Sequence, residues 1–340
     1  MPRLSVLMPV YNGARYLGES IASVLGQDFR DLELVVIDDG STDDTPRVAA
    51  EWAARDSRVV VLRRNENGGT ARALNAALPV ARGEYFARQD SDDIAAPFRF
   101  SRQVASFDAS PDVVVVSMAY RHIDAQGRLQ DRIDPYEEPE VLHHLLHFAP
   151  ALGAGGQLMF RAAAVRQLGG WEGAFRVSQG WEISTRLCRL GRVVVLHDVG
   201  IHYRRHPGGV SVVHGTEQMA NAVTIARRGL THLLGRAATQ EEAEAVGSIW
   251  FAAPSATAAP LADAVLRETF GRFSAAPRQR SRVRLLHASR FARAAMRLMR
   301  KGEARGAFRH LLLSLRWHML GAVAAVRSAI QARLSRGLPD

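Results

Sequence analysis

The feature that most restricts the fold of this sequence is a repeated order in its N-terminal part, where a short apolar run is followed at once by polar residues. The apolar runs and their polar followers are 4–8 with 11–12, 33–37 with 38–41, 59–62 with 65–69, and 84–87 with 90–93. Between the first two runs, Ala14 to Leu25 has apolar residues at helical spacing. Short strands that alternate with helices predict an α/β fold with a mostly parallel sheet. Ligands of such sheets bind beyond the carboxyl ends of the strands, so the four polar clusters are expected to meet in one crevice.

The pattern changes after Ser117. Gly127 lies where a hairpin turn is expected, and 193–196 and 201–203 are predicted as two further strands. From about Gly215 onward the chain is rich in Ala, Leu and Arg and is predicted to be mainly helical. The length of 340 residues accommodates two domains. We therefore expect an α/β domain over 1–214 and a basic, mainly helical region over 215–340.

Asp90, Asp92 and Asp93 form an acidic cluster directly after a buried strand. Carboxylates this close repel one another, and a cation between them removes that cost. Hard oxygen ligands favour Mg²⁺ or Mn²⁺, which usually takes one or two carboxylates and completes its shell with water and phosphate. The alternative is a solvated turn that caps a helix. The second acidic pair at another strand end, Asp38 and Asp39, favours the metal site.

Asp38 and Asp39 follow a strand that is too apolar to hold a free charge. A carboxylate there can accept hydrogen bonds from a base or from ribose hydroxyls, or it can cap the next helix. Asn67, Gly68 and Gly69 would let the backbone approach a ligand, and Arg72 follows one helical turn later, facing a phosphate or a base. Alone, each of these signals is weak.

Together and in this order, these segments resemble family 2 glycosyltransferases of the GT-A type over roughly residues 3–214. The segments that carry the resemblance are 9–12 (PVYN), 36–43 (VIDDGSTD), 65–75, 88–94 (RQDSDDI) with Pro97 and Arg99, 169–171 (GGW), and 203–208 (YRRHPG) with Val210 and Ser211. The resemblance implies a Rossmann-like GT-A domain, a nucleotide-sugar donor, a hydroxyl-bearing acceptor such as a glycan, lipid-linked sugar or small molecule, and inversion at the anomeric carbon.

The resemblance also implies roles for single residues. The nucleotide would be held by Pro9, Tyr11, Asp38 or Asp39, Asn67, Gly68, Arg72 and Ser91. Asp90 and Asp92 would carry the metal, with Asp93 in support, and Asp92 would serve catalysis through it. His206 would reach the metal or the diphosphate.

One departure from the family concerns the general base. The family's Glu-Asp pair at the start of an acceptor-side helix falls on Gln179 and Gly180, so both acids are missing. Glu182 is the candidate replacement, with a surface helix residue as the alternative. A general base contributes roughly 10²–10⁴-fold in rate. This departure supports a second hypothesis, a nucleotide-sugar-binding protein with weak or lost transfer activity.

The C-terminal region carries an uneven charge, with sixteen of the chain's 44 Lys and Arg between Arg272 and Arg336 against Glu303 as the only acid. Apolar residues over 290–316 predict a helical pair interrupted at 301–303, and 318–326 is an apolar patch suited to a membrane interface. The alternative is that the apolar stripes pack on the catalytic domain and the arginines are only solvated. No nucleic-acid partner is expected, because no reading motif or interleaved aromatics appear.

Two further expectations concern location and histidines. The short apolar N-terminus and the single cysteine predict a cytoplasmic protein, with attachment to the inner face of the plasma membrane through the tail as one alternative. His143, His144 and His147 have the spacing of a helical zinc site, and a polar helix face is the alternative.

Overall fold

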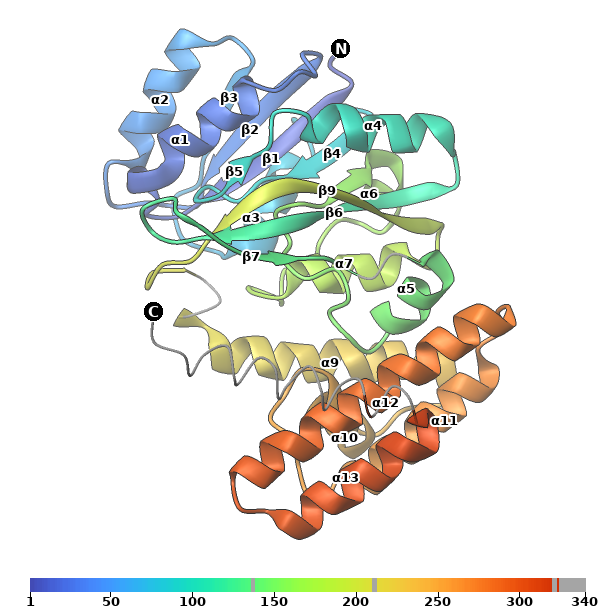
Figure 1. Cartoon of the computed structure of the whole chain (residues 1–340). Helices are drawn as coiled ribbons and strands as arrows, with labels where there is room; N and C mark the ends of the chain where they lie inside the picture. Colours follow the sequence, from blue (N-terminus) through green and yellow to red (C-terminus); the bar gives the residue numbers. More distant parts are fainter. Residues whose placement is uncertain (136–137, 210–212, 320–322, 324–340) are drawn as a thin grey trace. The chain divides into compact units, whose positions relative to one another are not determined.

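The computed structural model describes residues 1–135, 138–209, 213–319 and 323 (Figure 1). The chain separates into two compact units, of which the first holds 1–146 with 151–221 and the second holds 147–150 with 222–340. The break falls inside helix α9, which runs from Gly215 to Leu234. Among the described residues, no helix combines the length and the apolar content needed to cross a bilayer.

The first unit alternates strands and helices as the sequence predicts. Its elements are β1 Leu4–Val10, α1 Ala14–Leu25, β2 Leu32–Asp38, α2 Thr45–Arg55, β3 Val59–Arg63, α3 Thr70–Ala77, β4 Tyr85–Arg88, β5 Ile94–Ala95, α4 Arg99–Ala109, β6 Val113–Ile123, β7 Leu129–Ile133, α5 Pro139–Leu146, β8 Met159–Arg161, α6 Ala162–Gln167, α7 Gln179–Leu187 and β9 Arg192–Arg204. The hairpin between β6 and β7 turns at Gly127, which has a φ of 83°.

A single mixed sheet organises this unit, in the order β3-β2-β1-β4-β8-β6-β9-β5 with β7 paired to β6. Strands β1 to β4 are parallel. Strand β8 runs antiparallel to both β4 and β6, and β9 runs parallel to β6. The carboxyl ends of β1 to β4, β6 and β9 therefore lie along one edge of the sheet, which is where a ligand is expected.

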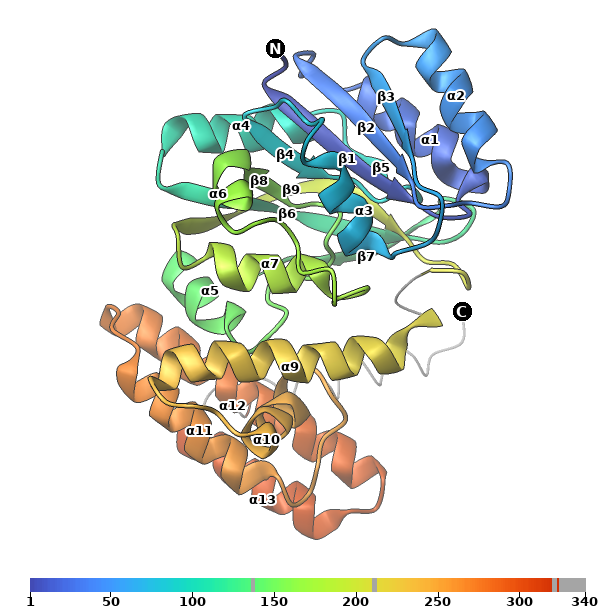
Figure 2. The ribbon, with the colours of Figure 1, turned by 180° about the vertical axis from the view of Figure 1, so that it is seen from behind.

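Helices cover both faces of the sheet. Figure 1 shows α1, α2 and α4 on one face, and Figure 2, from behind, shows α3, α6 and α7 on the other. The first face holds a core of Met8 from β1, Leu17 and Ile21 from α1, and Phe100 and Val104 from α4. Alternate residues of a strand point to opposite faces, and helices cover both faces of this sheet. The central strands are therefore continuous apolar runs in the sequence.

The prediction of two strands over 193–196 and 201–203 is wrong, because β9 is continuous from Arg192 to Arg204. The polar residues His197 and Asp198 interrupt the apolar pattern but not the strand. They form a bulge, since Met118 pairs with Leu196 and Ala119 with Val199. A bulge inserts extra residues without ending the pairing.

The second unit is helical. Besides the later part of α9, it contains α10 Gln240–Trp250, α11 Ala259–Arg272, α12 Pro277–Arg300 and α13 Ala304–Trp317. Thr239 and Glu242 form a capping box at the start of α10. Helices α12 and α13 are the helical pair predicted over 290–316, and they are separated at Lys301–Glu303. The apolar patch predicted over 318–326 lies largely outside the described residues.

Candidate nucleotide and metal site

Asp38 ends β2 with its side chain fully buried. Its Oδ1 accepts a hydrogen bond from the Ser41 backbone N–H at 2.9 Å. Its Oδ2 is buried and has no hydrogen-bond partner in the described part of the chain, and the Nε of Arg63 lies 3.6 Å from it. Buried carboxylate oxygens normally accept hydrogen bonds, so Oδ2 is available to a donor group of a ligand.

Asp39 joins the loop after β2 to the loop after β3. One carboxylate oxygen pairs with Arg64, and the other accepts from the Gly69 backbone N–H at 2.8 Å. Asn67 Oδ1 also accepts from the Gly69 N–H, at 3.0 Å. Gly40, with a φ of 79°, allows the close approach of the two loops, because a Cβ there would lie 2.8 Å from the Glu66 carbonyl carbon. The two loops thus form one wall.

The other residues that the sequence predicts to bind the nucleotide lie at the same edge of the sheet as these two loops. Pro9 pairs with Ile37 in the sheet, and Tyr11 follows β1 with 48% of its surface exposed. Gly68 is buried beside Arg64, and Arg72 is exposed in the first turn of α3. Ser91 faces the loop after β1, where a Cβ on Gly13 would lie 3.4 Å from its Oγ. These residues belong to the end of β1, the start of α3 and the loops after the strands, at the same edge of the sheet.

The three acids after β4 converge with His206. The Asp92 Oδ2 lies 2.9 Å from the His206 Nε2. Asp90 Oδ1 accepts from Arg88, with the Nε at 2.9 Å. Asp93 is buried, and its Oδ1 accepts from the Arg204 backbone N–H at 2.8 Å. The end of β9 therefore closes onto the acidic loop after β4.

The acidic cluster fits a divalent cation. Asp93 Oδ2 is buried and has no hydrogen-bond partner among the described residues. A Cβ on Gly156 would lie 3.1 Å from Asp93 Oδ2 and 3.2 Å from Asp90 Oδ2, so a side chain at this position would crowd both carboxylates. Burial, with Asp92 and Asp90 nearby, raises the pKa of Asp93 well above its usual value. A hard cation among these oxygens would offset that uncompensated charge.

Several residues of this site carry no separate role in the sequence prediction. Arg204 is buried, and its guanidinium donates to the Asp92 carbonyl oxygen at 2.8 Å and to Glu19 at 2.6 Å. Tyr16 packs between Arg204 and His206, with its ring centroid 4.5 Å from the guanidinium carbon and 5.1 Å from the imidazole centroid. In the sequence, Tyr16 is one more apolar position of a predicted helix. Only its packing against Arg204 and His206 shows that it belongs to this site.

Arg99 binds the residues that lead into the acidic loop. It is fully buried and donates to Gln89 at 2.8 Å and to the Arg88 carbonyl oxygen at 2.7 Å. Burial lowers the pKa of Arg99 to about 9, with Asp93 and Asp90 opposing the shift. These bonds fix the backbone that presents Asp90.

Glu182 lies in the first turn of α7 with 3% of its surface exposed. Its carboxylate binds Arg186, with the closest pair at 2.5 Å, and Arg186 also donates to the Gly170 carbonyl oxygen at 2.8 Å. Burial raises the pKa of Glu182, against the opposing effect of Arg186. Gly180, at the position of the missing acid, is buried, and a Cβ there would lie 3.4 Å from Arg88 Nη1.

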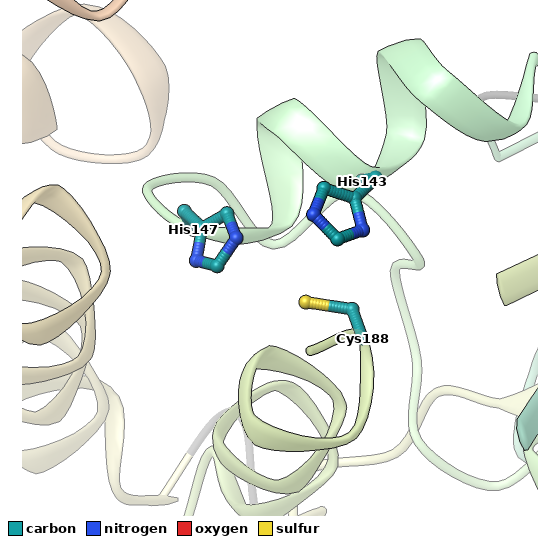
Figure 3. Close-up of side chains that lie close together, drawn as sticks. All are labelled: His143, His147 and Cys188. Atoms are coloured by element: carbon teal, nitrogen blue, oxygen red, sulfur yellow. The ribbon is translucent and has the colours of Figure 1, made fainter. Parts of the chain in front are cut away.

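Of the three histidines with the spacing of a zinc site, His143 and His144 lie in the last turn of α5, and His147 follows the helix. His144 is fully buried, and burial lowers its pKa to about 3. Figure 3 shows His143 beside Cys188, with a ring nitrogen and the sulfur within 4.8 Å of each other. Burial raises the pKa of the Cys188 thiol to about 12. This pair offers two ligands, whereas zinc usually takes three or four protein ligands, so we assign no metal to the pair.

Most of the sequence that matches known proteins lies in the first unit. Residues 5–168 match the model of glycosyl transferase family 2. The putative glycosyltransferase EpsE of Bacillus subtilis is 37% identical over 177 residues, which are 52% of this chain and 62% of that protein. The glycosyltransferase GlyG of Streptococcus pneumoniae is 35% identical over 127 residues, 36% of this chain and 41% of that protein. The chain thus spans less than two thirds of these relatives.

Solved structures share the fold at low identity. TarS from S. aureus, in a complex with UDP, superposes with a TM-score of 0.55 at 18% identity, covering 91% of this chain and 89% of that one. The mannosyltransferase PcManGT of Pyrobaculum calidifontis, in complex with GDP-Man and Mn²⁺, superposes with a TM-score of 0.53 at 22% identity, covering 94% and 87%. Residues 5–168 therefore form a glycosyltransferase family 2 domain, and the first unit has the GT-A fold.

Proposed function

We propose that this protein transfers a sugar from a nucleoside diphosphate donor, with a UDP-sugar as the default, to a hydroxyl-bearing acceptor with inversion and with the help of Mg²⁺ or Mn²⁺. The observation that carries the proposal is the convergence of Asp90, Asp92 and Asp93 with His206, where Gly156 adds no side chain beside the carboxylates. Solved structures of the same fold were obtained with UDP, UDP-GlcNAc, and GDP-Man with Mn²⁺, which supports this class of donor.

In this proposal the strand-end loops hold the nucleotide. Asp38 Oδ2, which has no hydrogen-bond partner, accepts from the base or the ribose. Tyr11 and Pro9 border the base, and the loop of Asn67 and Gly68, fixed by Asp39, lies along the same wall. Arg72 is an exposed cation at the start of α3 that faces a phosphate or the base.

Asp90, Asp92 and His206 would hold the metal, with Asp93 and Ser91 in the same loop. The ion supplies neutralisation of the charge that develops on the departing diphosphate. An acceptor oxygen forms its bond to the anomeric carbon as the bond from that carbon to the diphosphate breaks, and the electron pair remains on the diphosphate. The acceptor proton passes to a base, for which Glu182 stays the candidate that the sequence names.

Asp92→Asn tests the metal assignment. We expect Mn²⁺-dependent binding of UDP to weaken at least tenfold by calorimetry, because the amide removes one charged ligand while it preserves shape. The matched control is Asp112→Asn, an exposed acid paired with Arg192 at the opposite end of β6. Unchanged affinity in Asp92→Asn, with the fold intact by circular dichroism, would refute the assignment.

The second hypothesis, a donor-binding protein with weak or lost transfer, rests on the missing acids at Gln179 and Gly180. The pairing of Glu182 with Arg186 favours it, since Arg186 occupies both carboxylate oxygens and the side chain is buried. Metal-dependent UDP binding, combined with no release of UDP from UDP-glucose, UDP-galactose or UDP-GlcNAc over hours with any of a panel of hydroxyl-bearing acceptors, would select it over transfer.

The basic C-terminal region suggests that the reaction takes place at a membrane surface. Helix α13 exposes Phe308, Leu312 and Leu315 at helical spacing, and Arg305 and Arg309 are exposed beside them. An apolar stripe flanked by arginines suits the interface of an anionic membrane. We propose that this helix attaches the protein to such a surface.

A further inference from the structure

A cavity of about 570 Å³ lies in the first unit where β6 and β9 end. Its walls include Tyr120, His122, Tyr203, Arg204, Arg205 and His206. Because β6 and β9 are parallel, with His122 paired to Tyr203, their carboxyl ends bring these side chains to the edge of the sheet that also holds the acidic cluster. None of the nucleotide residues that the sequence names, apart from His206, lines this cavity.

The cavity continues from the proposed metal site. His206 and Arg204 belong to both, since His206 contacts Asp92 at 2.9 Å and the Arg204 guanidinium donates to the Asp92 carbonyl oxygen. A molecule in the cavity would therefore contact His206, which also contacts Asp92. A second substrate held there would lie next to a donor held by the metal.

Three rings form one side of the cavity. Tyr120 and His122 meet at a centroid distance of 5.4 Å and an angle of 81°, and His122 and Tyr203 at 5.6 Å and 75°. Ring edges and faces of this kind pack against the C–H faces of a sugar while leaving its hydroxyls free. The Tyr120 and Tyr203 rings are 6.2 Å apart, so they form one continuous surface.

His122 adds an unsatisfied polar group to that surface. The residue is 5% exposed, and its Nδ1 is buried with no hydrogen-bond partner among the residues that the structure describes. Burial lowers the pKa of His122, helped by Arg205 and opposed by Asp131. A neutral imidazole both donates and accepts, which suits a hydroxyl-rich ligand.

Arg205 supplies charge at the rim. Its backbone N–H donates to the Ile123 carbonyl oxygen at 2.8 Å, which ties it to β6, and its side chain is exposed. Within the described part of the chain it has no ion-pair partner, whereas the neighbouring Arg204 is paired with Glu19. A free guanidinium beside an aromatic wall favours an anionic group on the ligand, because Arg binds carboxylate and phosphate with paired hydrogen bonds.

We propose that this cavity is the acceptor site and that it takes a sugar carrying a carboxylate or a phosphate. The inference rests on the proposed sugar transfer and names the chemical class of its second substrate. The rings select the sugar, and Arg205 selects the anionic substituent.

Binding of matched sugar pairs tests the proposal. The full chain, saturated with UDP and Mn²⁺, is titrated with glucose and glucose 6-phosphate, and with galactose and galacturonate. We expect the anionic member of at least one pair to bind at least tenfold more tightly. Arg205→Gln should reduce that ratio to below threefold, and Tyr203→Ala should weaken both members. The matched control is Arg192→Gln, an exposed arginine at the other end of β9, which should keep the ratio.

The outcomes separate this inference from the proposed function. No UDP binding by the wild-type protein contradicts the donor site. Intact UDP binding with ratios below threefold in both pairs overturns only the acceptor site, as does a ratio that survives Arg205→Gln. If Arg205→Gln weakens UDP-glucose but leaves UDP unchanged, the cavity holds the donor sugar and the proposal is wrong.

Discussion

Gly180 shows how one side chain decides what the site can do. A Cβ at this position would lie 3.2 Å from the Gly155 Cα and 3.4 Å from Arg88 Nη1. An acid here would therefore lie beside the guanidinium that now binds Asp90. The glycine leaves Arg88 to Asp90 and leaves the acceptor side without the family's base.

Gly180→Asp is expected to raise the rate of UDP release from UDP-glucose in water by at least about tenfold, since a general base contributes 10²–10⁴-fold and Arg88 would hold part of the new charge. Steady-state kinetics measures the rate. Gly180→Asn is the matched control, because it has the same bulk without a base. An equal effect of Asn and Asp would contradict a role for the base.

His144 makes the stability of the protein depend on pH. Its pKa of about 3 lies below the usual 6.5, so the unfolded chain binds a proton first and stability falls as the pH drops from about 6.5 toward 3. From pH 7 to pH 5 this residue should cost about 2 kcal/mol. Urea unfolding of His144→Leu should show a smaller loss over that range, and the exposed His197→Gln should behave like the wild type. An identical pH dependence in His144→Leu would exclude this origin.

At the scale of elements, the site depends on loops from different strands that hold one another. The loop after β2 contacts the loop after β3 through Asp39, and the end of β9 contacts the loop after β4 through Arg204. The residues of each contact lie far apart in the sequence. The sheet brings them together because β1 to β4, β6 and β9 end at one edge.

Gly40→Ala tests the first of these contacts. The new Cβ would approach the Glu66 backbone to 2.8 Å at a φ of 79°, so the loops must separate. We expect a loss of stability of roughly 1–3 kcal/mol and a UDP affinity at least tenfold weaker. Gly302→Ala is the matched control, with the same φ of 79° and nothing within 4 Å. It should keep UDP affinity, and equal affinities in the two variants would contradict the coupling of the loops.

At the scale of the whole molecule, the net charge of +10 is concentrated in the C-terminal region. Polyanion binding by such a region weakens with salt, because exposed charges are screened. The exposed residues Phe308 and Leu312, with 63% and 51% of their surfaces exposed, add an apolar term that salt does not screen. Both terms act together only on a surface that is anionic and has an apolar interior.

A double variant, Phe308→Ser with Leu312→Ser, should bind vesicles of phosphatidylcholine and phosphatidylglycerol at least tenfold less tightly in a sedimentation assay, while UDP affinity stays constant. Leu129→Ser is the control, since Leu129 is 62% exposed on β7 of the first unit. Equal binding of the wild type to vesicles of phosphatidylcholine alone, or no loss in the double variant, would exclude the membrane surface as the partner.

The sequence by itself determined the alternation of strands and helices, because apolar periodicity is local, and the family, because the ordered motifs at the strand ends are specific. It also located Asp38, Asp39, Asp90 and Asp92. The burial of Asp93, the closeness of Gly156 to Asp90 and Asp93, and the pairing of Glu182 with Arg186 were decided by the tertiary structure. So was the cavity at Tyr120 and Tyr203. The physical reason is that burial, charge compensation and free space depend on neighbours that are distant in the chain, and only the packed sheet sets those neighbours.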